Sequence, residues 1–158
     1  MSPTQASPSL TSEERLLAAI SYGEASTQDN YEEMAAIASV MVRQMKARGY
    51  TTIRSFTTND RTFSFALTDG NVRYGKLMEA RDRDIEKSAS MSNAVRAARN
   101  AFSGGPDYSN GAYFWDGADI KSNYINHPKV RLGVHIDPAH NVYQIPDSER
   151  LKILYKTV

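Results

Sequence analysis

Apolar side chains recur at helical spacing over much of the first hundred residues. In the earliest of these patterns, Leu17, Ile20 and Glu24 lie at i, i+3 and i+7. Thr11 and Glu14 have the spacing of a capping box, which marks the start of a helix. The pattern predicts a first helix that directs Glu24 toward the core.

Further helices are predicted downstream. The second starts at a capping signal on Asn30 and Glu33, ends at Gly49 and buries an apolar stripe made of Met34, Ile37, Ala38, Met41 and Met45. Residues 75–87 are heavily charged and predict a solvated surface helix. A helix from Ser92 follows and is ended by a Gly-Gly-Pro run.

The remaining segments predict loops and strands. Residues 50–71 combine Ser, Thr, Asn and Asp with aromatic residues, which predicts a loop with a short extended piece at 63–67. In the last third, GAYFWDG is an aromatic run, RLGVHI alternates apolar and polar positions, and NVYQI is typical of its hairpin partner. We therefore predict an α+β fold, with helices first and a small antiparallel sheet in the C-terminal third.

The length of 158 residues fits one domain, and we expect residues 1–10, rich in Ser, Pro and Thr, to be a flexible leader to a domain over 11–158. The net charge of +1 comes from 19 basic and 18 acidic residues mixed along the chain, so no nucleic-acid partner is expected. Cysteine is absent, which excludes thiol catalysis and disulfides. No apolar run is long enough to span a membrane, and residues 1–10 lack the pattern of a Sec signal.

Glu24, beside Tyr22, is the first candidate for chemistry. A carboxylate on a buried face is costly, and a helix C-terminus carries partial negative charge, so both effects favour the protonated acid. A carboxylic acid kept neutral can donate a proton. The alternative is structural, because a Glu near a helix end often reaches water or pairs with an Arg.

A second group combines aromatic rings with polar side chains that could stack on sugars or bases and read their polar edges: Phe63, Ser64, Tyr108, Tyr113, Phe114 and Trp115. In a strand, Tyr113 and Trp115 would point to one face and Phe114 to the other. One face could then line a groove. The alternative is that all three rings pack in the core.

A third group offers imidazole and carboxylate ligands for zinc or another divalent ion: His127, His135, Asp137 and His140. The spacing matches no strong metal signature, and Asp and His are common at turns, so we expect no metal and no cofactor. Phosphate-loop and GxSxG nucleophile signatures are absent from the sequence.

Five segments also occur in the order of a known family. They are LLAAISYGEAS, EEMAAIASVMVRQM, TFSF, NGAYFWDG and GVHIDPAHNVY, spread over residues 14–145. In this series the chain resembles the cell-wall hydrolases typified by bacterial spore-cortex-lytic enzymes. It departs from them at Arg43-Gln44, where the family has Asn-Arg, and in the loop after Glu24, which lacks the family's Gly-Glu.

The resemblance implies a lysozyme-like catalytic domain that cuts the glycan strand of peptidoglycan between N-acetylmuramic acid and N-acetylglucosamine. It gives Glu24 the role of catalytic acid/base. The matching motifs imply groove or support positions for Phe63, Ser64, Tyr113, Phe114 and His135. Together with Tyr22 and Trp115, these are the expected substrate-binding residues.

The number of carboxylates bears on the mechanism. Hydrolysis of a glycoside by the common route needs two, about 5 to 9 Å apart. Only Glu24 is clearly positioned, which favours a lytic transglycosylase, where one residue serves in turn as acid and base. Hydrolysis stays open, with a second carboxylate from Asp29, Glu32, Glu33, Asp69 or Asp116.

Two other functions are kept as alternatives. One is a metal-dependent hydrolase built on His135, Asp137 and His140, and the other is a non-catalytic module that binds cell-wall glycan. Without a Sec signal, we expect synthesis in the cytoplasm and action at the cell wall or periplasm after delivery by another route, as for an antibacterial effector or a lysis protein. An immunity protein or a secretion machine would then be a partner.

Overall fold

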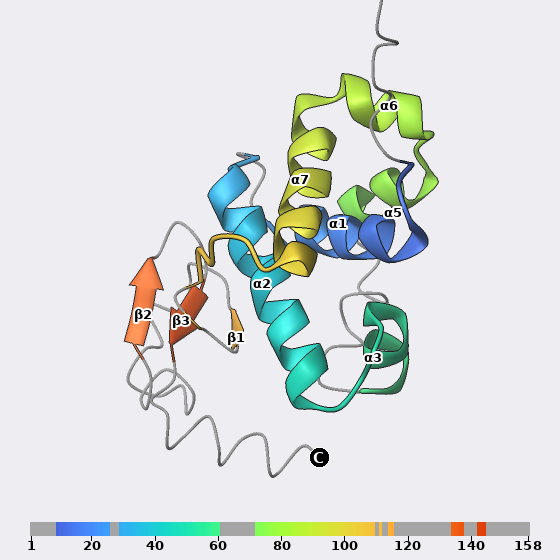
Figure 1. The fold of residues 1–158 in the computed structure, drawn as a ribbon. Helices are drawn as coiled ribbons and strands as arrows, with labels where there is room; N and C mark the ends of the chain where they lie inside the picture. Colours follow the sequence, from blue (N-terminus) through green and yellow to red (C-terminus); the bar gives the residue numbers. More distant parts are fainter. Residues whose placement is uncertain are drawn as a thin grey trace, which may run out of the picture.

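The computed structural model describes residues 9–25, 29–60, 72–109 and 111, together with the backbone of three short strands (Figure 1). In the four ranges, 75% of the residues are helical and none lies in a strand. The prediction of an α+β fold, with the lysozyme-like architecture that the resemblance implied, is therefore wrong. The protein is mostly helical, because helices alone supply the described core.

The helices and strands have the following bounds. The helices are α1 (Ser12–Glu24), α2 (Tyr31–Ala47), α3 (Ile53–Asn59), α5 (Val72–Glu79), α6 (Asp82–Lys87) and α7 (Ala89–Ser103). The strands are β1 (Phe114–Trp115), β2 (Val134–Asp137) and β3 (Val142–Gln144). They pair antiparallel in the order β1-β3-β2, with an irregular register between His135 and Asp137. With two to four residues each, these strands add little to a fold built from helices.

Helix α1 lies at the centre of the described helices. It contacts α2, α5 and α7, and Figure 1 shows it between α2 and α5 with α7 crossing it. Every residue from Leu16 to Gly23 is buried, so α1 has no solvated face over this stretch. The helix ends at Glu24, and Ala25 directly after it is still part of the core.

The predicted starts of the first two helices are confirmed. The Thr11 hydroxyl accepts the Glu14 N–H at 3.0 Å, and the Glu14 carboxylate accepts the Thr11 N–H at the same distance. The Asn30 side chain accepts the N–H groups of Glu32 and Glu33. The predicted methionine stripe of α2 is also confirmed as core, because Met34, Met41 and Met45 are buried.

Helix α3 lies inside the segment predicted as a loop. Its N-terminus is held by α1, since the Glu13 carboxylate accepts the N–H groups of Ile53 and Arg54 at 2.6 and 3.1 Å. Ile53 and Phe56 bury their side chains completely. A contact from 40 residues away therefore satisfies the first N–H groups of this helix, and local sequence cannot reveal such a partner.

The charged segment predicted as one helix forms two. A break at Ala80 and Arg81 separates α5 from α6, and each helix buries one side chain, Leu77 and Ile85 respectively. Helix α7 begins three residues before the predicted start, because the Ser88 hydroxyl accepts the Met91 N–H and caps it.

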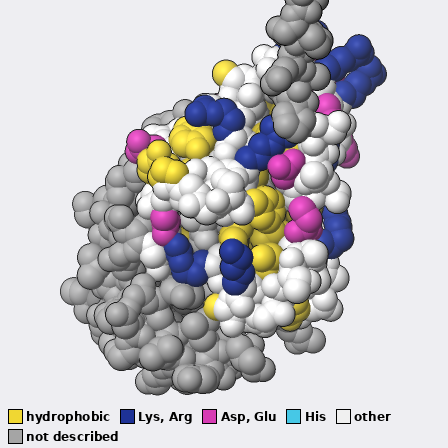
Figure 2. All heavy atoms as spheres, viewed as in Figure 1, with side chains coloured by type: hydrophobic (Ala, Val, Ile, Leu, Met, Phe, Trp, Pro, Cys, Tyr) yellow, Lys and Arg dark blue, Asp and Glu magenta, His cyan; other side chains and the backbone are white. Residues whose placement is uncertain are grey.

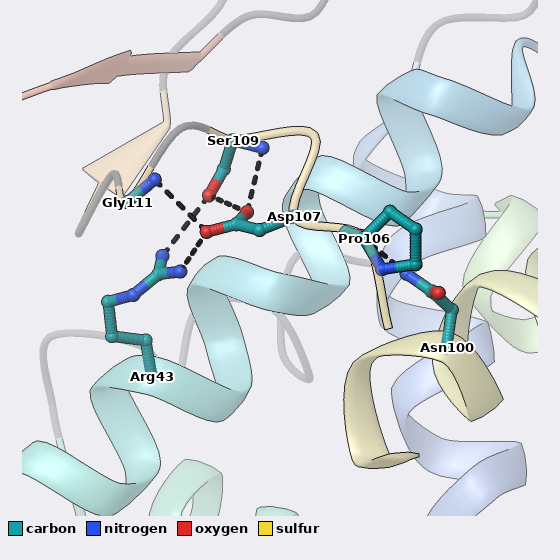
Figure 3. A network of polar contacts seen from close by, with 6 residues as sticks. All are labelled: Arg43, Asn100, Pro106, Asp107, Ser109 and Gly111. Carbon is teal, nitrogen blue, oxygen red and sulfur yellow. Dashed lines mark hydrogen bonds and ion pairs between the residues drawn. The ribbon is translucent and has the colours of Figure 1, made fainter. Parts of the chain in front are cut away.

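The segment after α7 is fastened to α2 by a polar network around Asp107 (Figure 3). Its carboxylate accepts the N–H groups of Ser109 and Gly111 at 2.8 and 3.0 Å and forms an ion pair with Arg43 of α2. Arg43 also donates to the Ser109 hydroxyl at 3.1 Å. The Arg43 side chain that departs from the family pattern thus has a structural role, holding the chain that leads toward β1.

The residue after Arg43 also has a structural role. Gln44 is fully buried, and its carbonyl oxygen accepts the Arg48 Nε–H at 2.7 Å. Arg48 in turn forms a buried ion pair with Asp60 at 2.8 Å, directly after α3. Arg43 thus connects α2 to the segment after α7, and Gln44 supports Arg48, which connects the end of α2 to Asp60.

The surface of the described helices mixes both signs of charge. On the face drawn in Figure 2, Lys and Arg side chains are interspersed with Asp and Glu, with hydrophobic side chains between them. Across the described ranges, none of the helices has the length and apolar character that crossing a bilayer requires.

Candidate functional site

Glu24 is the last residue of α1, and it lies where the buried helix reaches the surface. Tyr22 and Gly23 before it are buried, whereas Glu24 is partly exposed, so the prediction that the first helix directs Glu24 toward the core is wrong. The Ala25 N–H donates to the Ser21 carbonyl at 3.0 Å and completes the last turn. Glu24 thus ends a helix that is buried from Leu16 to Gly23 and is itself partly exposed.

The end of α1 receives a cation from another helix. No basic residue lies in the last turn of α1 itself. Arg73 of α5 donates through Nε–H to the Tyr22 carbonyl at 2.8 Å, and its guanidinium lies over the Tyr22 ring, 3.8 Å from the centroid. A helix C-terminus has carbonyls without intrahelical partners and a partial negative charge. Arg73 donates a hydrogen bond to one of these carbonyls and places a positive charge beside them.

The same guanidinium also holds the chain beyond α1. Arg73 Nη2 lies 2.7 Å from the Asp29 carboxylate, directly before the N-cap of α2. Asp29 has φ of 57°, a left-handed conformation that Asp tolerates better than most residues. Arg73 therefore contacts the chain on both sides of Glu24, at Tyr22 and at Asp29.

Tyr22 is fixed on its other side by α7. Its hydroxyl lies 3.4 Å from the Ser90 hydroxyl, and Ser90 in turn lies 3.2 Å from the Ser88 hydroxyl at the start of α7. The Tyr22 side chain is only 3% exposed. Its expected role in substrate binding stays a prediction, and its observed role is to join the last turn of α1 to α5 and α7.

The nearby carboxylates differ in environment. Asp29 is engaged with Arg73, Glu32 is exposed in the first turn of α2, and Glu33 is fully buried one residue later. The other two candidates for a second carboxylate, Asp69 and Asp116, lie outside the described residues. Of the carboxylates that are described here, Glu24 is the one that ends the central helix.

Most of the other predicted site residues lie outside the described residues or have only their backbone described. Phe63, Ser64, Tyr113, His127 and His140 lie outside the described residues. Phe114 and Trp115 belong to β1, and His135 and Asp137 to β2, with only their backbone described. Within the described ranges, no group of three or more His, Asp or Glu residues could hold a metal ion.

Tyr108 is the one member of the predicted aromatic set whose side chain is described. Its ring meets Tyr31 edge to face at 5.9 Å, and Arg96 lies over Tyr31 at 4.6 Å. A shallow hollow of about 610 Å³ beside them is lined by Tyr31, Arg96, Arg99, Asn100 and Phe102, and also by Glu14. Glu14 is ten residues, or about 15 Å of helix, from Glu24, so the Glu14 side of this hollow lies at the other end of α1.

Arg73 and Ser90 are the residues of this site that sequence reasoning missed. The one available signal is the position of Arg73 four residues before Leu77, the buried residue of a helix that is otherwise charged. Residues at i and i+4 share a helix face, so the position of Leu77 directs Arg73 toward α1 as well.

Comparisons with protein-family models, with curated proteins and with solved structures found no match to this chain. The resemblance to the spore-cortex-lytic enzymes therefore rests on the sequence motifs.

Proposed function

We propose that this protein cleaves the glycan strand of peptidoglycan, with Glu24 as the general acid. The observation that carries the proposal is that Glu24 ends a helix buried from Leu16 to Gly23 and is itself partly exposed. A carboxyl group at the end of a buried helix, itself partly exposed, can meet a bound substrate in a defined geometry. The series of family motifs around Glu24 supports the choice of substrate.

The proposed reaction needs one carboxyl group. Glu24 gives its proton to the glycosidic oxygen as the bond to the anomeric carbon breaks. The carboxylate then takes the proton of the muramyl 6-hydroxyl, whose oxygen attacks the anomeric carbon and closes a 1,6-anhydro ring. Two of the five candidates for a second carboxylate are already engaged or enclosed, since Asp29 forms an ion pair with Arg73 and Glu33 is fully buried.

The substrate sets where the protein works. Peptidoglycan glycan strands lie outside the cytoplasmic membrane, so we propose that the protein acts at the cell wall or in the periplasm after delivery. A secretion or immunity partner belongs to the same proposal.

The test is a digestion of purified bacterial sacculi by the wild-type protein and by Glu24→Gln, followed by mass spectrometry of the soluble products. We expect muropeptides that are one water lighter than the hydrolytic product from the wild type. Glu24→Gln should release at least about 100-fold less product, since a general acid contributes about that much or more. Glu79→Gln is the control, because Glu79 is an exposed residue of α5.

Three outcomes would contradict this proposal. Ordinary reducing ends would replace the anhydro route with hydrolysis and require a second carboxylate. Inactivation by a chelator, with Glu24→Gln still active, would favour the metal-dependent hydrolase. Binding to sacculi without any released product would make the protein a glycan-binding module. Circular dichroism of each variant establishes that the fold is intact.

A further inference from the structure

We infer that Arg73 is a positioning residue for Glu24, acting from α5 on the turn that carries the carboxyl group. This inference rests on the proposed function of Glu24. Arg73 contacts the Tyr22 carbonyl at 2.8 Å, the Tyr22 ring at 3.8 Å and the Asp29 carboxylate at 2.7 Å. These contacts lie two residues before and five residues after Glu24, so one side chain restrains both ends of the segment that contains it.

The charge distribution explains why an arginine is needed here. The last turn of α1 carries partial negative charge from carbonyls without intrahelical partners, and α1 has no basic residue in that turn. An ordered last turn therefore gains from a cation supplied by another helix. The guanidinium is a planar cation with several N–H donors, so it can donate to a carbonyl and a carboxylate while stacking on a ring. A lysine ammonium could make only part of this set of contacts.

The opposite end of the same helix pair provides an internal comparison. Arg15, in the first turns of α1, donates to the Leu77 and Ala80 carbonyls at the end of α5, at 2.8 and 2.7 Å. Arg73 does the same for the end of α1. The two helices therefore run antiparallel, and each contributes an arginine to the other's C-terminus. Only the arginine from α5 acts on the turn that carries Glu24.

The experiment compares Arg73→Gln, Arg73→Lys and Arg15→Gln with the wild type. On soluble peptidoglycan glycan chains, at a temperature where every variant is folded, we expect Arg73→Gln to lower kcat by about 10- to 100-fold with KM changed less than about threefold, as for a small misplacement of a catalytic group. Arg73→Lys should recover part of the loss. Arg15→Gln should lower the thermal midpoint and leave kcat within about twofold.

Hydrogen exchange gives a second readout that does not need activity. Peptides that cover the last turn of α1 should exchange faster in Arg73→Gln than in the wild type, and Arg15→Gln should leave their exchange unchanged. If the wild type cleaves no glycan but this exchange pattern is observed, the proposed function of Glu24 is refuted. The conclusion that Arg73 restrains the last turn of α1 would still hold.

Two results would overturn the inference itself. One is an Arg73→Gln variant with wild-type kcat. The other is an equal loss of kcat in Arg15→Gln and Arg73→Gln, because Arg73 would then contribute only to the general stability of the helix pair.

Discussion

Asp107 is a partly buried carboxyl group whose ionised form holds two parts of the fold together. Burial by itself raises the pKa of this carboxyl. Hydrogen bonds from the Ser109 side chain and backbone, the charge of Arg43 and the Gly111 N–H together outweigh burial, so the pKa lies below its ordinary value. The carboxylate is thus stabilised in the folded protein, where it fastens the segment after α7 to α2.

This lowered pKa predicts an acid-sensitive contribution to stability. Above the ordinary pKa of Asp, about 3.9, Asp107 is ionised in both states and its full contribution is present. As the pH falls through the lower folded pKa, the unfolded state binds the proton first and the contribution is lost. Asp107→Asn should therefore reduce the free energy of unfolding at pH 7 by about 1–2 kcal/mol, discounted for partial exposure, and by progressively less toward pH 2.

Urea denaturation at a series of pH values measures this difference. Asp84→Asn is the control, because Asp84 is an exposed carboxylate of α6 and its replacement should change stability by less than about 0.5 kcal/mol. A deficit of Asp107→Asn that stayed constant from pH 7 to pH 2 would argue against an ionised Asp107 as its source.

At the scale of the helices, the backbone conformation of a glycine depends on whether it lies at the end of a helix or inside one. Helix α7 stops at Gly104, which adopts φ of 73° and ends the helix in the left-handed conformation. Gly75 lies inside α5 without a positive φ, and at either glycine a Cβ would meet no atom within 4 Å beyond the adjacent backbone. The two positions therefore differ in backbone conformation and not in available space.

Replacement of each glycine by alanine should change stability in opposite directions. Gly104→Ala should lower the free energy of unfolding by about 1 kcal/mol, because a Cβ is strained in the left-handed region. Gly75→Ala should raise it by about 0.5–1 kcal/mol, because alanine is the better helix former. Urea denaturation of both variants checks the signs, and a stabilised Gly104→Ala would refute the strain at the end of α7.

At the scale of the whole molecule, the burial of α1 holds the described helices together. Leu16, Leu17 and Ile20 are all 0–1% exposed, and α2, α5 and α7 all contact their helix. Side chains from every side of α1 thus enter the core. A smaller side chain in the buried part of α1 therefore weakens its packing against the three neighbouring helices.

Leu17→Ala should accordingly reduce the free energy of unfolding by about 2–5 kcal/mol, from lost burial and the cavity left behind. Chemical denaturation with a single transition measures this value. Val72→Ala is the control. Val72 is 83% exposed, so its truncation should change the free energy of unfolding by less than about 0.5 kcal/mol. A cost below 1 kcal/mol for Leu17→Ala would contradict the central place of α1.

The starts of α1 and α2 were predictable because Thr11 and Asn30 bond to N–H groups within three residues. Helix α3 has a similar local cap, in which the Thr52 hydroxyl accepts the Ser55 N–H, and this signal was missed. Its other capping partner, Glu13, bonds to the Ile53 N–H from 40 residues earlier and has no local signal. The α+β fold class was wrong because it was inferred from alternation in the C-terminal third, whereas 75% of the residues in the four described ranges are helical.

The candidate site was predictable to the same extent. Periodicity alone indicated that Glu24 follows Leu17 and Ile20 on one helical face. The partners of its turn were not predictable, because Arg73 lies 51 residues from the Tyr22 carbonyl to which it donates. Arg73 lies two residues before the charged segment over 75–87, whose pattern is typical of solvent-facing helices.

The sequence by itself determined the positions of the α1 and α2 starts, the buried methionine stripe of α2 and the presence of Glu24 at the end of the first helix. These features depend on spacing within one or two turns, which sequence records directly. Only the tertiary structure decided that α1 is buried on all sides and that Arg73 acts on its last turn. Both depend on which helices pack together, and packing joins residues whose separation along the chain carries no local signal.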